Sequence, residues 1–296
     1  MKKSLKKSLI VLILPFTSLI ADTQLDFSSL VNEFMNESNG LKTTINLSGK
    51  QRMLTQRMSK LVIQIQLNIQ KKQSTEKLKK MATLYAKTLK AFRDADSELG
   101  ISKATNTEVL EQIGVVEKEW KTFYTHIQLI VDDKAKKKSF SYVLSNNEKL
   151  LKVSNELVKR YEASNSSSNY LEKARLRVLN VAGQQRMLTQ KMTKEKLLLV
   201  RGDKSYETKV EDTVKLFDDS LKSLQKGDKA QNIGKATNEK IIKQLRVVAT
   251  IWSELKPLYK KKKNTAKELA VIISKNPLLL KEMNTMVVLA EKEVEY

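Results

Sequence analysis

The sequence contains no cysteine and a single histidine, His126. The lack of cysteine excludes disulfides, thiolate metal sites and cysteine nucleophiles, and one histidine argues against a Ser-His-Asp triad or a two-histidine metal site. Glycine (8) and proline (3) are also scarce in these 296 residues. Since β-rich folds need many turn residues, the composition favours helices. No carboxylate pair recurs at a fixed spacing, so we expect neither an enzyme nor a bound cofactor or metal.

The first 21 residues have the pattern of a secretory signal peptide. A basic start containing Lys2 and Lys7 precedes a short apolar stretch, Leu9–Ile20, and Ala21 is a suitable last residue before cleavage. The stretch is shorter than the roughly 20 residues of a spanning helix, although an uncleaved anchor is the alternative. No later stretch is apolar enough to span a bilayer. We therefore expect a periplasmic protein that is not membrane-spanning once residues 1–21 are removed.

The formal net charge is +22, and loss of the signal segment would lower it by its four lysines. A basic protein attracts phosphate backbones, anionic lipid or small oxyanions. Lysine runs such as Lys136–Lys138 and Lys260–Lys263 have no interleaved aromatic residues, unlike nucleic-acid platforms. We interpret them as solvated surface and expect no nucleic-acid partner.

The chain is an internal repeat. Ile45–Met58 recurs as Leu179–Met192, at an offset of 134 residues. Three further landmarks recur in the same order: Thr88–Phe92 as Thr213–Phe217, Ile101–Asn106 as Ile233–Asn238 with Trp120 and Trp252 downstream, and Asn147–Asn155 as Asn276–Asn284. Their offsets of 125 to 134 indicate a tandem duplication. The tryptophans are interpreted as core residues, and Asn155 and Asn284 as inter-helix hydrogen-bonding residues.

Apolar residues recur at helical spacing throughout both copies. The expected helices cover 28–72, 75–99, 106–131 and 141–163 in the first copy, and 168–201, 205–226, 237–263 and 265–294 in the second. Short connections favour antiparallel neighbours, so the predicted fold is all-α, with two tandem up-and-down four-helix bundles at 22–164 and 165–296. Thr105 and Glu108 fit a capping box, and Pro257 should kink or end its helix.

One stripe of the repeated motif combines apolar and polar residues. On a helix, Gly49, Arg52 and Gln56 share a face with Ile45 and Ile63. Gly183, Arg186 and Gln190 do so in the second copy, with Leu179 and Leu197. Glycine permits close helix approach, and a desolvated guanidinium needs an anionic partner. That partner is either a ligand or an internal acid, namely Asp94, Asp219 or a glutamate on a neighbouring helix. Arg57 and Lys191 fall on another face and are assigned a secondary role, at the rim or in packing.

The two segments Gly-Lys-Gln-Arg-Met-Leu-Thr-Gln-Arg-Met and Gly-Gln-Gln-Arg-Met-Leu-Thr-Gln-Lys-Met resemble the signature of the PilJ-type domain, the N-terminal domain of type IV pilus methyl-accepting chemotaxis transducers. They also resemble the P-box of nitrate/nitrite sensor kinases. The resemblance implies an extracytoplasmic four-helical sensor bundle. It also implies that Arg52 and Arg186 bind an anion where two motif helices meet. Such receptors have a second membrane span and a cytoplasmic module, and we expect neither before Tyr296.

Two functional hypotheses follow. The first is an exported sensor-type protein that binds a small oxyanion such as nitrate or nitrite through Arg52 and Arg186, with Gly49, Gly183, Gln56 and Gln190 around them, and that works with a membrane receptor or sensor kinase in signal transduction. The alternative is an interaction module without a small ligand, which docks on an envelope receptor or another partner protein.

Overall fold

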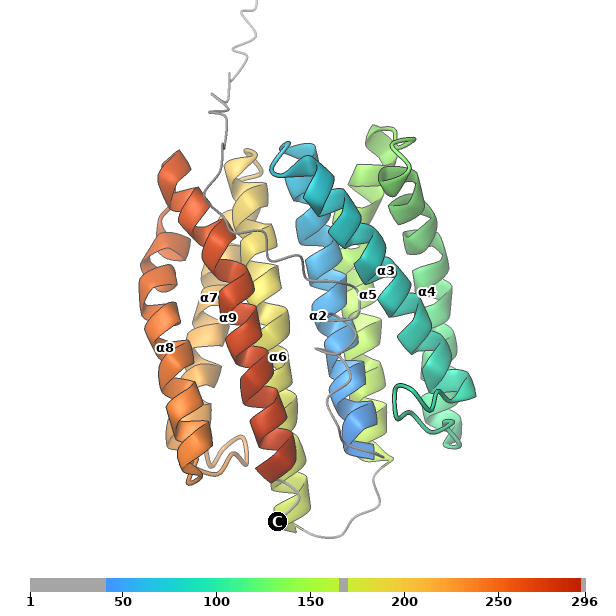
Figure 1. Ribbon diagram of the computed structural model, residues 1–296, viewed down its shortest axis with the longest axis vertical. Helices are drawn as coiled ribbons and strands as arrows, with labels where there is room; N and C mark the ends of the chain where they lie inside the picture. The colour runs from blue at the N-terminus through green and yellow to red at the C-terminus, as the bar shows by residue number, and fades with distance from the viewer. Residues whose placement is uncertain (1–40, 165–169, 294–296) are drawn as a thin grey trace, which may run out of the picture.

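The computed structural model describes residues 41–164 and 170–293 (Figure 1). Three expected features lie outside these residues: the signal peptide (1–21), the part of the first helix that precedes residue 41, and the domain boundary at 165–169. The described residues form eight helices: α2 (Leu41–Gln66), α3 (Lys71–Asp94), α4 (Thr107–Val131), α5 (Lys137–Ala163), α6 (Tyr170–Val200), α7 (Tyr206–Lys226), α8 (Glu239–Lys260) and α9 (Ala266–Glu293). They contain no β-strand, only the isolated bridges Asp96–Ile101 and Asp228–Ile233. The predicted all-α class is confirmed.

The helices form two four-helix bundles that meet along α2 and α6 (Figure 1). In the first bundle α2 packs on α3 and α5, and α4 closes the square; α6, α7, α9 and α8 repeat this arrangement. The side chains of Gln66 and Arg201, at the carboxyl ends of α2 and α6, are hydrogen-bonded at 2.8 Å. The two motif helices therefore run parallel, at the centre of the molecule.

Aromatic residues fill equivalent places in the two bundles. The rings of Tyr85 and Trp120 lie 4.2 Å apart, and those of Phe217 and Trp252 lie 4.5 Å apart. The side-chain amides of Gln51 and Gln185 donate to the carbonyl oxygens of Tyr85 and Phe217, respectively. The tryptophans are buried, which agrees with the predicted core role.

These contacts correct one part of the predicted repeat. They make Tyr85, not Phe92, the equivalent of Phe217, so α3 and α7 correspond at an offset of 132 rather than 125. The predicted pairing of Thr88–Phe92 with Thr213–Phe217 is therefore wrong by seven residues. Seven residues are almost two helical turns, so the wrong register places apolar residues on nearly the same face.

Several helix ends also differ from prediction. The N-cap of α4 is Asn106, whose side chain accepts from the amide of Val109, so the Thr105 capping box is wrong by one residue. Ala95 has a left-handed φ of 76°, and it ends α3 at Asp94 rather than at 99. Pro257 does not end its helix, since α8 continues to Lys260.

Candidate functional site

The repeated motif lies where α2 and α6 face each other, as the polar stripe predicted. The absence of a side chain at Gly49 makes room for two guanidinium groups. A Cβ atom at Gly49 would lie 3.2 Å from Nη2 of Arg52 and 3.6 Å from Nη2 of Arg186. At Gly183 the corresponding distances are 3.5 Å and 3.4 Å. The two guanidinium groups therefore lie beside each other and are shared by both copies of the motif.

Both arginines are buried, with 3% (Arg52) and 1% (Arg186) of their surface exposed. Arg52 donates from Nη1 to Oδ1 of Asn155 (2.9 Å) and from Nη2 to Oδ1 of Asn180 (2.8 Å). The first acceptor comes from the same bundle, and the second comes from the motif helix of the other bundle. Each bundle thus completes the surroundings of the other's arginine.

Arg186 repeats this pattern. Its Nη1 donates to Oδ1 of Asn284 (2.9 Å), and its Nη2 donates to Oδ1 of Asn46 (2.9 Å). The predicted inter-helix hydrogen-bonding role of Asn155 and Asn284 is confirmed. Asn46 and Asn180 were not predicted, although both recur at the motif offset of 134.

Carboxylates lie one step further from the guanidinium groups. The amide of Asn46 donates to Oε2 of Glu291 at 2.8 Å, and Asn180 is hydrogen-bonded to Glu162. Burial lowers the pKa of Arg52 to about 10, and the negative charge of Glu162 opposes that shift. Burial also raises the pKa of Glu162. Arg52 therefore stays charged at neutral pH, beside neutral amides and within the field of the partly buried Glu162.

The aspartates considered as internal partners are elsewhere. Asp94 pairs with Lys90, and Asp219 pairs with Lys215, each one turn away on an exposed helix face. The carboxylate that acts electrostatically on Arg52 is that of Glu162, and Nε of Arg52 is buried without a hydrogen-bond partner among the described residues. Of the internal partners considered, Asp94 and Asp219 are therefore excluded.

The two motif glutamines belong to a second polar layer, about one turn beyond the arginines. Gln56 accepts from Nζ of Lys194 at 2.7 Å, and Gln190 donates to Oδ1 of Asn276 at 3.2 Å. The same Asn276 oxygen accepts from Nζ of Lys60 at 2.7 Å. Lys60 and Lys194 are equivalent buried lysines that the sequence reasoning missed.

The lysine layer is not symmetric. Lys194 is paired with Glu148 (2.6 Å) and with Oδ1 of Asn147 (2.7 Å). In the other copy Pro277 occupies the position of Glu148, so Lys60 has the equivalent asparagine without the carboxylate. Burial, followed by the charges of Arg57 and Lys77, holds the pKa of Lys60 well below its ordinary value.

The two residues assigned a secondary role, Arg57 and Lys191, are partly buried. Lys191 is one-quarter exposed and pairs with Glu148 at 3.2 Å. It also lies 3.9 Å from the carboxylate of Glu195, whose pKa burial raises to about 7. Arg57 is partly buried on the corresponding part of α2.

Across residues 41–164 and 170–293, no helix has the length and hydrophobicity needed to cross a membrane. In that same part of the chain, no three histidine or acidic side chains gather in a way that would hold a metal ion.

The fold and site define a class: a tandem pair of four-helix bundles whose signature helices meet around buried arginines. The sequence matches the family model of the type IV pili methyl-accepting chemotaxis transducer N-terminal domain over residues 34–153 and 172–272. The chain therefore belongs to the PilJ family, as the motif resemblance indicated. A search of curated proteins finds no match.

Membership of the PilJ family indicates a general function. The family is a sensory domain of chemotaxis transducers, not an enzyme family, and such domains work with signalling partners. Its members are typically periplasmic sensing domains.

Proposed function

We propose that this chain is an exported, periplasmic sensor-type protein that binds a small anion between Arg52 and Arg186, with nitrate and nitrite as the first candidates. One observation carries the proposal. Two guanidinium groups lie side by side in a buried helix interface, and each donates to neutral asparagine oxygens. Two buried cations so close together repel each other, and a monoanion between them would remove much of that repulsion.

The chemistry of the site suits a planar oxyanion. A guanidinium group is a rigid fork of donors that matches the spacing of two oxygen atoms. The asparagines hold both forks in place from two directions, so the cations would need little rearrangement on binding. The family's sensory role supports a signalling function, and a membrane receptor or sensor kinase is the partner through which binding would be signalled.

Isothermal titration calorimetry on the chain lacking residues 1–21 tests this proposal. Nitrate and nitrite should bind saturably, with chloride and sulfate as comparison anions. Replacing both arginines by lysine keeps the charge but removes the fork, and it should weaken binding at least tenfold. Nitrate should also raise the melting temperature of the parent chain, because it binds only the folded state.

Arg52→Ala combined with Arg186→Ala should abolish binding. Circular dichroism of that variant establishes that the bundles remain folded. Nitrate affinity that is unchanged in the folded double variant, or the absence of saturable binding to the parent chain by any of the four anions, would overturn the proposal.

The alternative is a ligand-free interaction module, and the asparagines favour it. Four amide oxygens already accept from the two arginines, which is how a purely structural buried polar network is satisfied. In that case the double alanine variant would lose stability while no anion bound, and pull-down from envelope extracts would recover a protein partner.

A further inference from the structure

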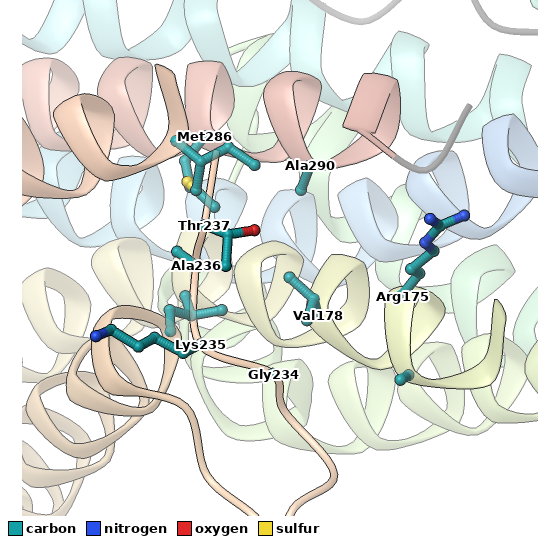
Figure 2. A pocket seen from close by; sticks show the side chains of 11 residues that line it. Arg175, Val178, Gly234, Lys235, Ala236, Thr237, Met286 and Ala290 are labelled. Atoms are coloured by element: carbon teal, nitrogen blue, oxygen red, sulfur yellow. The ribbon is translucent and has the colours of Figure 1, made fainter. Parts of the chain in front are cut away.

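The second bundle contains a cavity of about 330 Å³ near the amino-terminal end of α6. It lies between α6, the end of α7, the loop that precedes α8, and α9. Figure 2 shows Val178, Ala236, Thr237, Met286 and Ala290 around this space. A cavity of this size falls in the range of small-molecule sites. It is separate from the arginine pair, because neither Arg52 nor Arg186 lines it.

The two copies of the repeat explain why the cavity exists. In the first bundle, the rings of Phe92 and Tyr161 lie 5.6 Å apart, and both residues are buried. At the offsets of 132 for α3 and α7 and 129 for α5 and α9, their equivalents are Leu224 and Ala290, which both line the cavity. The second bundle has therefore lost two aromatic rings from this place. An apolar molecule in this place would contact the side chains that the two rings cover in the first bundle.

The ionisable residues among those that line the cavity are basic. Arg175 and Lys235 are its two ionisable lining residues, and none of the eleven lining residues is acidic. Figure 2 places these two cations on opposite sides of the space. The hydroxyl of Thr237 adds a polar group between them. An apolar interior with a positive rim complements a molecule that has an apolar body and an anionic end.

We propose that this cavity binds a small hydrophobic carboxylate, such as an aromatic or short aliphatic acid. The apolar body would replace the missing rings beside Leu224 and Ala290, and the carboxylate would lie at the positive rim. This site is independent of the arginine pair, so each proposal can fail without the other.

Benzoate and octanoate are the probes, and benzyl alcohol is the neutral counterpart of benzoate. Calorimetric titration of the chain lacking residues 1–21 should give saturable binding of at least one acid, and benzyl alcohol should bind at least tenfold more weakly than benzoate. The affinity for benzoate should be measured for Lys235→Met and for Arg175→Met. At least one of these substitutions should weaken benzoate binding several-fold without affecting the binding of benzyl alcohol.

Ala290→Tyr places in the second bundle the aromatic residue that the first bundle has at the equivalent position, Tyr161. It should reduce benzoate binding at least tenfold while nitrate binding stays as in the parent chain. Leu224→Phe serves the same purpose if Ala290→Tyr does not fold. The proposal is overturned if neither acid binds saturably, if a folded filling variant retains full affinity, or if benzyl alcohol binds as tightly as benzoate.

Discussion

At the scale of single residues, the glycine of each motif sets the position of both arginines. Gly49 and Gly183 lie on adjacent helices, and the place of a Cβ atom at either is within 3.6 Å of both guanidinium groups. A methyl group at Gly49 would come within 3.2 Å of Arg52, which is tighter than ordinary contact. Because two asparagines hold that guanidinium, it can move aside only by lengthening a buried hydrogen bond.

We therefore expect Gly49→Ala to be less stable than Gly114→Ala. In α4 a Cβ atom at Gly114 would approach nothing closer than 3.7 Å, so alanine there should gain helix propensity of up to about 1 kcal/mol. At Gly49 the displaced guanidinium should cancel that gain, leaving a difference of about 1–2 kcal/mol between the variants. Urea denaturation measures both free energies of unfolding. Equal stabilisation by the two substitutions would show that the arginine can move freely.

At the scale of helices, α5 and α9 make the lysine layer unequal. Glu148 on α5 pairs with Lys194, whereas α9 offers Pro277 at the equivalent place beside Lys60. Burial disfavours the charged form of both lysines, and the Glu148 carboxylate offsets this for Lys194. The buried amine of Lys60 is therefore hydrogen-bonded to an amide, whereas the equivalent amine of Lys194 is also paired with a carboxylate.

This comparison predicts the effect of restoring the acid. Pro277→Glu should stabilise the protein at pH 7 more than Pro277→Gln does, by about 1–3 kcal/mol, because only glutamate offers Lys60 a charge-assisted hydrogen bond. Both variants remove the proline, so their difference isolates the charge. Thermal and urea unfolding at pH 7 measure it, and equal stabilities would mean that residue 277 does not reach Lys60.

At the scale of the whole molecule, the two bundles meet as the halves of a symmetric dimer do. Arg52 donates a hydrogen bond to Asn180 of the other bundle, and Arg186 donates the equivalent hydrogen bond to Asn46. Such reciprocal contacts define an isologous interface, here formed by two copies within one chain. The interface also buries Lys60 and Lys194, which a separated bundle would expose along one side.

We accordingly expect a chain of residues 22–164 to form a homodimer through α2. In that dimer Arg52 of each copy would donate to Asn46 of the other, which reproduces the observed pairing. Sedimentation equilibrium at micromolar concentration measures the association, with Asn46→Ala as the variant that should weaken it at least tenfold. A folded, monomeric chain at that concentration would contradict this expectation.

Much of this fold was predictable, because the helical periodicity and the repeated motif are both local patterns. The orientation of Arg52 and Arg186 toward the helix interface followed from the spacing of glycine, arginine and glutamine. The register of α3 against α7 did not, since a shift of seven residues preserves the apolar face. Asn46 and Asn180 were missed because their partners lie on the other copy, and a pattern within one repeat says nothing of how the repeats pack.

The difference between Glu148 and Pro277 has a genetic consequence. In an assembly of two identical polypeptides, one codon change alters both halves at once, so neither half can specialise alone. Here each half is encoded separately, and one can keep its acid while its twin loses it. Because the copies are joined in a single chain, the interface between them can become asymmetric. The two contacting surfaces of a homodimer are always identical in sequence, whereas these two can diverge.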